Sequence, residues 1–104
     1  MIYVSDHVTD TLTKLTMTGQ VLLTYRDKDL GCPQGLTSPD DGQLLVCGWS
    51  SNNVQLVSRN GKKVRTLLFE DGIVRPQIIC YDASMRTLCV ANDCRSEIKV
   101  YRVK

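Results

Sequence analysis

The amino-acid sequence predicts an all-β protein, and three observations support this prediction. Short apolar runs rich in β-branched residues recur along the chain, and most of them are bounded by Gly, Pro, Asn or Asp. No stretch of roughly eleven or more residues keeps the apolar spacing that an amphipathic helix needs. The chain also repeats itself about every 42 residues, as a comparison of Ile2–Asp6 with Leu44–Gly48 shows. A repeat of about 40–50 residues filled with short strands is typical of a β-propeller, whose four-stranded blades pack round an axis.

Each repeat contains the same sequence blocks in the same order. A first apolar block lies at Ile2–Asp6, Leu44–Gly48 and Leu88–Asn92. A second apolar block lies at Leu12–Leu15, Val54–Val57 and Ile98–Tyr101. A turn pair ending in glycine then follows at Thr18–Gly19 and Asn60–Gly61, and a Pro-Gln pair opens the next element at 33–34 and 76–77.

Ten strands are expected from these blocks and from the turns between them. Their predicted ranges are 2–5, 11–16, 21–26, 35–38, 44–48, 53–58, 63–69, 77–82, 87–91 and 97–103. The segment 38–42 reads Ser-Pro-Asp-Asp-Gly and predicts a type I turn. Asn60-Gly61 predicts a tight hairpin, because both residues tolerate positive φ.

The order of these strands predicts a partial β-propeller. Counted outward from the axis, the four strands of one complete antiparallel blade fall within residues 31–75. Residues 1–30 would lack the innermost strand of their blade, and residues 76–104 would lack the outermost one. Two flanking blades are therefore incomplete, and their uncovered faces and strand edges need partners. We expect the remaining blades of a longer parent chain to supply them, with self-association as the alternative.

The composition excludes several other classes of protein. No apolar run is long enough to span a membrane. A net charge of +2 argues neither for nor against a nucleic-acid partner, because local clustering of charge matters more than the sum. The chain contains five cysteines in no CxxC pair, which favours a reducing compartment, so we expect a cytoplasmic protein. With His7 as the single histidine, neither a metal nor another cofactor is expected.

The repeated blocks resemble NHL repeats. Ile2–Asp6, followed by a polar stretch, Leu12–Leu15 and Thr18-Gly19, is similar to the apolar strand, polar loop, apolar strand and glycine turn of that family. The middle repeat departs from the pattern, because Gly48 replaces the usual acidic residue and Trp49 follows it. Asn53 is the nearest match to a family asparagine that often precedes the third strand.

The resemblance implies a propeller, often six-bladed, that commonly forms the C-terminal part of tripartite-motif (TRIM) proteins. There it recognises target proteins or RNA for ubiquitination or repression. The RING and B-box parts of such proteins need Cys/His clusters, and the coiled coil needs heptads; neither pattern is present in this sequence. The resemblance therefore implies a non-catalytic binding module that forms the target-recognition part of a TRIM-type ubiquitin ligase. A protein partner is expected first and RNA is the alternative.

One face of the predicted propeller gathers the candidate binding residues. The loops between the second and third strands of each blade, and those between blades, lie on one face of a propeller, and binding residues concentrate on such loops. The candidates on that face are His7, Arg26, Lys28, Trp49, Asn52, Arg75 and Arg95. An exposed tryptophan beside cations could stack on a base or anchor a partner side chain. The alternative is that Trp49 packs on its own blade and the charges are only solvated.

Other groups of polar residues have simpler explanations. Arg59, Lys62, Lys63 and Arg65 form the densest basic cluster, which is expected to protect an outer strand from edge pairing rather than to bind phosphate. The segments 27–29 and 40–42 lack the spaced ligands of a calcium loop and are interpreted as turns.

An enzyme of the gluconolactonase-like propeller type is the alternative to a binding module. Such an enzyme would need carboxylates and an asparagine that converge on an axial metal. Asp6 and Asn92 occupy equivalent repeat positions and could contribute, but Gly48 breaks the set. No catalytic residue is therefore predicted.

Overall fold

Ten strands make up the regular structure in the computed structural model, which describes residues 2–39, 42–67, 73–92 and 98–102. The strands are β1 (Ile2–Asp6), β2 (Thr11–Leu15), β3 (Val21–Tyr25), β4 (Pro33–Thr37), β5 (Leu44–Gly48), β6 (Asn53–Val57), β7 (Lys63–Leu67), β8 (Pro76–Asp82), β9 (Thr87–Asn92) and β10 (Ile98–Arg102). Within these ranges no helix is long and apolar enough to cross a membrane.

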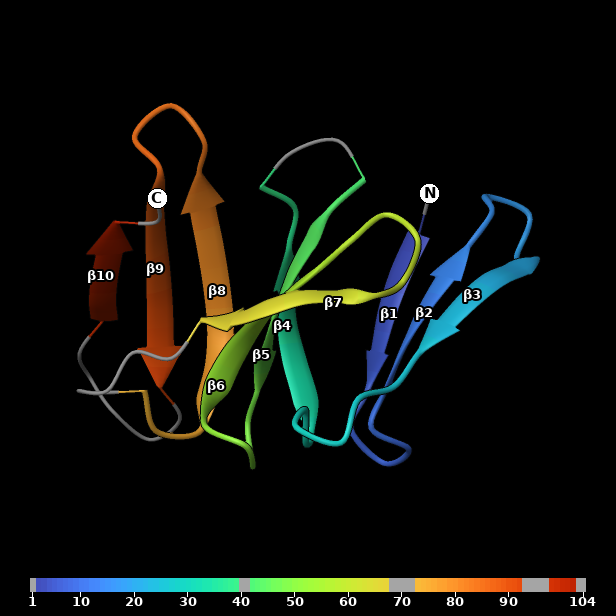
Figure 1. Cartoon of the computed structure of the whole chain (residues 1–104), viewed down its shortest axis with the longest axis horizontal. Helices are drawn as coiled ribbons and strands as arrows, with labels where there is room; N and C mark the ends of the chain where they lie inside the picture. The colour runs from blue at the N-terminus through green and yellow to red at the C-terminus, as the bar shows by residue number, and fades with distance from the viewer. Residues whose placement is uncertain (1, 40–41, 68–72, 93–97, 103–104) are drawn as a thin grey trace.

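The strands form three antiparallel sheets that follow one another across the molecule (Figure 1). The first sheet has the order β1-β2-β3, the second β4-β5-β6-β7, and the third β10-β9-β8. The chain is thus a partial β-propeller in which one complete four-stranded blade is flanked by two three-stranded ones. This confirms the predicted fold class.

The strand boundaries differ from the predicted ones mainly at the innermost strands. β4 and β8 begin at Pro33 and Pro76, one or two residues earlier than predicted. Proline suits the first residue of a strand, where its missing N–H costs no ladder hydrogen bond. A register shift follows each of these prolines. The predicted residues 68–69, 97 and 103 lie outside the described ranges.

The innermost strands approach each other closely. A Cβ atom placed on Gly35 of β4 would lie 2.8 Å from the backbone oxygen of Gln77 and 3.0 Å from the backbone nitrogen of Ile79, both in β8. On the other side of β4, the Ser5 hydroxyl of β1 donates a hydrogen bond to the backbone oxygen of Gln34 at 2.8 Å. Glycine at position 35 therefore lets two blades pack backbone to backbone near the axis.

The middle blade separates two apolar cores. Alternate side chains of β5 point to opposite faces, so Leu44 and Val46 belong to the core shared with the first blade. Leu45 and Cys47 belong to the core shared with the third blade. All five residues of β5 are buried as a result. This agrees with the sequence, in which Leu44–Gly48 contains no polar side chain.

The hairpins between the two outer strands of a blade are built alike in the first and second blades. The amide of Gly19 donates to the carbonyl of Thr16, and the amide of Gly61 donates to the carbonyl of Ser58. Both glycines adopt positive φ. Asn60 tolerates positive φ but is not among the described residues that adopt it. The turn needs a left-handed residue only at glycine, as in a type I turn followed by a bulge.

Candidate functional site

The loops that carry the predicted binding residues lie at one end of the three sheets. They are the β1–β2 and β5–β6 loops, together with the β3–β4 loop and the residues before β8, at the lower end of the view in Figure 1. We call this end the loop face. Six of the seven candidate residues lie within the described ranges, and Arg95 lies outside them.

A hydrogen bond that recurs from blade to blade builds this face. The Asp10 carboxylate, just before β2, accepts the backbone N–H of Cys32 at 2.8 Å. One repeat later, the Asn52 side-chain oxygen, just before β6, accepts the backbone N–H of Arg75 at 2.7 Å. Each bond joins the loop inside one blade to the entrance of the next blade. We call them the loop-to-loop bonds.

The four residues of these bonds share an uncommon backbone conformation. Their φ angles are 57° at Asp10, 49° at Cys32, 53° at Asn52 and 46° at Arg75. Asp and Asn tolerate this left-handed region better than other side chains do. Cys32 and Arg75 both precede a proline, which disfavours the right-handed helical conformation at that position. Local sequence thus favours the left-handed conformation at Asp10 and Asn52, whereas at Cys32 and Arg75 it only disfavours a helical one.

Further hydrogen bonds join the β5–β6 loop to the β3–β4 loop. The backbone N–H of Trp49 donates to the Cys32 carbonyl at 2.9 Å, and the backbone N–H of Ser50 donates to the Gly31 carbonyl at 3.2 Å. The Asn53 amide group donates to the Asp29 carbonyl at 2.8 Å. A Cβ atom on Gly48 would lie 2.7 Å from the Asn53 side-chain oxygen. A side chain at position 48 would therefore require the Ser51 and Asn53 side chains to move.

Trp49 and Arg75 contact each other across the boundary between two blades. The Arg75 guanidinium lies 5.7 Å from the centre of the Trp49 ring, within the range of a cation–π interaction. Trp49 is half-buried, whereas Arg75 and Asn52 are exposed. The tryptophan is therefore only partly exposed, and a cation lies beside its ring. Its partner is an arginine from the entrance of the next blade.

A second part of the loop face is a hollow beside the first blade. It has a volume of about 690 Å³ and opens to solvent, and its lining residues are Val8, Thr9, Asp10, Arg26, Asp27, Lys28, Leu30 and Gly31. Arg26 donates one hydrogen bond to the Thr9 carbonyl at 3.1 Å and is exposed, as is Lys28. His7 is exposed in the neighbouring loop and does not line the hollow.

The acidic side chain in the hollow that faces the middle blade is already engaged. Asp27 accepts a hydrogen bond from the Gln55 amide group at 3.0 Å and lies 3.5 Å from the Lys63 ammonium. The hydrogen bond from Gln55, followed by those from the Asp29 amide and Lys63, holds the pKa of Asp27 below its ordinary value. Lys63 also pairs with the Asp29 carboxylate at 3.4 Å. The free positive charge of the hollow therefore comes from Arg26 and Lys28.

The predicted basic cluster contains one lysine, Lys63, whose charge is engaged in ion pairs. Lys63 pairs with the Asp27 and Asp29 carboxylates of the β3–β4 loop. The other three members, Arg59, Lys62 and Arg65, are exposed around the β6–β7 hairpin and β7. The Leu30 N–H donates to the Asp27 carbonyl at 3.0 Å, so the segment 27–29 forms the predicted turn.

A buried polar link between the first two blades could not be found from sequence spacing. The Tyr25 hydroxyl donates to the Gln55 side-chain oxygen at 2.8 Å, and both residues are buried. Burial, with the negative charges of Asp27 and Asp29, raises the pKa of Tyr25 to about 12. The one signal in the sequence is a glutamine in the middle of an otherwise apolar block, at a position where it must find a partner.

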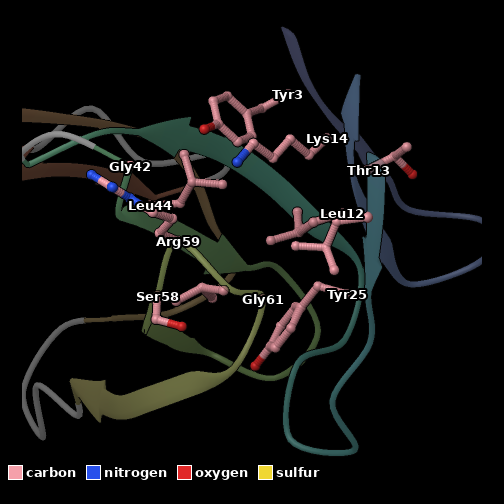
Figure 2. A pocket seen from close by; sticks show the side chains of 12 residues that line it. Tyr3, Leu12, Thr13, Lys14, Tyr25, Gly42, Leu44, Ser58, Arg59 and Gly61 are labelled. Carbon is pink, nitrogen blue, oxygen red and sulfur yellow. The ribbon is translucent and has the colours of Figure 1, made fainter. Parts of the chain in front are cut away.

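A small cavity lies between the first and middle blades, and residues of the β6–β7 hairpin, Ser58, Arg59 and Gly61, form part of its lining (Figure 2). Its volume is only about 20 Å³, and its walls include the core side chains Leu12, Leu44 and Tyr25. Lys14 and Arg59 supply its cations. Because the apolar walls Leu12, Tyr25 and Leu44 belong to the inter-blade core, the loop face remains the candidate site.

The two residues of the alternative enzyme interpretation, Asp6 and Asn92, both accept hydrogen bonds from backbone amides. The Asp6 carboxylate accepts the amide of Val8 at 2.9 Å and that of Thr9 at 3.3 Å. The Asn92 side-chain oxygen accepts the amide of Val74 at 3.3 Å. Among the residues that the structure describes, no three His, Cys, Asp or Glu side chains are grouped to bind a metal ion.

Comparisons with known proteins agree with the fold. No protein-family model matches the sequence, and no curated protein matches it. Among solved structures, a catalytically inactive virginiamycin B lyase from Staphylococcus aureus with quinupristin covers 97% of this chain, with a TM-score of 0.68 and 13% identity. A functionally unknown protein from Desulfotomaculum acetoxidans covers 94%, with a TM-score of 0.70 and 14% identity. The WD40 domain of Pan2 from Neurospora crassa covers 88%, with a TM-score of 0.56 and 17% identity.

These similarities show the β-propeller class and nothing finer, because all three identities are low. The chain spans 37% of the length of the lyase, 32% of the Desulfotomaculum protein and 30% of the Pan2 domain. The described sheets thus correspond to about a third of each of these structures.

Proposed function

We propose that this chain is a non-catalytic binding module and that its loop face recognises a protein segment. The observation that carries the proposal is the Trp49–Arg75 pair, which lies on the same face as the hollow with Arg26 and Lys28. Tryptophan and arginine are enriched among the residues that dominate binding energy. The WD40 domain among the structural neighbours supports a protein-interaction role for such a face.

The charges of the hollow favour an acidic partner. Asp27 is engaged by Gln55 and Lys63, and Asp10 accepts the Cys32 amide, so both carboxylates of the lining have partners within the chain. Arg26 and Lys28 remain exposed beside Val8, whose side chain is 79% exposed. An extended peptide with carboxylates and one apolar side chain would complement this set.

The resemblance to NHL repeats adds a finer proposal. In a longer protein, this face would form part of the target-recognition propeller of a TRIM-type ubiquitin ligase. The chain itself would then choose the target, and the ligase chemistry would belong to another part of the protein. A pull-down tests this proposal. The full-length protein should capture ubiquitinated targets, and a variant carrying Arg26→Glu and Lys28→Glu should lose them selectively.

Peptide binding can be measured through the fluorescence of Trp49, because the chain contains a single tryptophan. The probe is a pool of decapeptides rich in Asp and Glu, with a Lys-rich pool as the comparison. We expect saturable binding of the acidic pool, and we expect Arg26→Glu or Lys28→Glu to abolish it. The matched control is Lys62→Glu, an equal change of charge at the exposed hairpin at the other end of its blade. Equal weakening by Lys62→Glu would show that only net charge matters and would contradict the proposal.

A single-stranded RNA is the second probe in the same assay. If oligouridine binds saturably with a steep salt dependence while the acidic peptides do not bind, the face recognises RNA and the protein-binding proposal is wrong. If the chain hydrolyses lactones in the presence of a divalent metal ion, the non-catalytic part of the proposal is wrong.

A further inference from the structure

Two thiols lie opposite each other on the face of the third blade that is turned away from the middle blade. β8 and β9 pair in antiparallel register, and Cys80 is the direct partner of Cys89. The neighbouring pair, Ile79 and Val90, is buried in the core against the middle blade. Because side chains alternate between the faces of a sheet, Cys80 and Cys89 both point away from that core.

The spacing of such a pair fits a disulfide. Directly opposed residues of an antiparallel pair have Cα atoms about 4.5 or 5.5 Å apart, depending on the type of pair. A disulfide accepts Cα separations of about 4.4–6.8 Å. Cys80 is exposed, Cys89 is half-buried, and both are free thiols in the structure. The next side chain in the same row, Val100 of β10, pairs with Cys89 and is 63% exposed.

We propose that Cys80 and Cys89 form an oxidisable dithiol site that a peroxide converts to a cross-strand disulfide. One thiolate attacks the peroxide, so that an S–O bond forms, the O–O bond breaks and the first water leaves. The second thiol then attacks that sulfur, an S–S bond replaces the S–O bond, and the hydroxyl leaves as the second water. Two thiols are oxidised by two electrons and one hydrogen peroxide is reduced to two waters.

Cys47 is an internal control for this reaction. Its side chain is fully buried in the core between the middle and third blades. Burial raises the pKa of this thiol to about 11, which disfavours the reactive thiolate. Cys47 is therefore expected to stay reduced under conditions that oxidise the exposed pair.

The experiment treats the folded 104-residue chain with hydrogen peroxide, blocks the remaining thiols and maps the tryptic peptides. Cleavage after lysine and arginine, with the Arg75-Pro76 bond resistant, places Cys80 in the peptide 66–86 and Cys89 in the peptide 87–95. The second peptide also contains Cys94, so the map is repeated with Cys94→Ser. We expect the two peptides to be linked, with a loss of two hydrogens, in both proteins. The link should be absent from Cys89→Ser and from Cys80→Ser.

A rate comparison tests whether the sheet creates the site. The link should form at least about tenfold faster in the folded chain than in the chain unfolded in urea, because the sheet holds the second thiol nearby. Equal rates in the two states would contradict the proposal. So would a link that persists in Cys89→Ser, or oxidation of Cys80 to sulfinic or sulfonic acid without any link. Circular dichroism of each variant confirms that the comparison concerns folded protein.

Discussion

The side-chain oxygen of Asn52 accepts the backbone N–H of Arg75 at 2.7 Å, and both residues adopt positive φ. Asp10 and Cys32 repeat this relationship at 2.8 Å in the preceding repeat. The bond therefore belongs to the repeat itself, and it joins the loop of one blade to the entrance of the next. Its second example also brings Arg75 to the ring of Trp49.

Asn52→Ala should destabilise the chain by about 2 kcal/mol. The substitution removes the acceptor of the Arg75 amide, and alanine in the left-handed region costs about 1 kcal/mol or more. Asn52→Asp is the matched control, because it keeps both the acceptor and a side chain that tolerates this region. Urea unfolding measures the difference, and equal losses in the two variants would contradict the assigned role of the oxygen.

Gly35→Ala should weaken the junction of the middle and third blades. The added methyl group would lie 2.8 Å from the Gln77 backbone oxygen, and a backbone atom cannot move away as a flexible side chain can. We expect a loss of about 1–3 kcal/mol in thermal or urea unfolding. Gly31→Ala is the control, because the atom nearest its Cβ is the Ser50 hydroxyl oxygen, a side-chain atom that can rotate away. A neutral Gly35→Ala would show that the two innermost strands separate easily.

Stability should fall as the pH rises above about 10, and Tyr25 should contribute to that fall. Its pKa is raised to about 12 in the folded protein from an ordinary value of 10.0, chiefly by burial. Between these two pH values the unfolded chain loses the phenolic proton while the folded chain retains it, so the unfolded state is favoured. Tyr25→Phe should remove this part of the alkaline slope. Absorbance of the phenolate in the folded protein gives the pKa directly, and an ordinary value for Tyr25 would contradict the prediction.

Arg75→Ala should make Trp49 more accessible to the quencher acrylamide. The guanidinium covers one face of the ring in the structure, and the loss of the cation–π contact should also cost about 0.5–1 kcal/mol of stability. Arg26→Ala removes an exposed arginine from the hollow and should leave the quenching unchanged. An equal effect of the two variants would show that Arg75 does not shield the ring.

The strand pattern could be predicted from the sequence because it depends on local periodicity. The repeat between Ile2–Asp6 and Leu44–Gly48 was sufficient to place the corresponding strands, and the turn at Gly61 follows from glycine alone. The contacts of the site depend on residues distant in sequence. Gln55 and Tyr25 are 30 residues apart, and nothing local indicates that they share a hydrogen bond. The loop-to-loop bonds left a weak signal, since Asp10 and Asn52 hold equivalent repeat positions.

Side chains of β5 alternate between two interfaces, one with the first blade and one with the third. We call these interfaces seams, and each can be destabilised separately. Leu44 packs toward the first blade and its chain neighbour Leu45 packs toward the third. Truncation of either leucine should open only its own seam, although the two residues are adjacent in one strand. Hydrogen exchange after Leu44→Ala would then rise in the first blade and not in the third, while Leu45→Ala would give the reverse. In a propeller built from such blades, one interface between two blades can therefore be destabilised by a single substitution while the next interface stays intact.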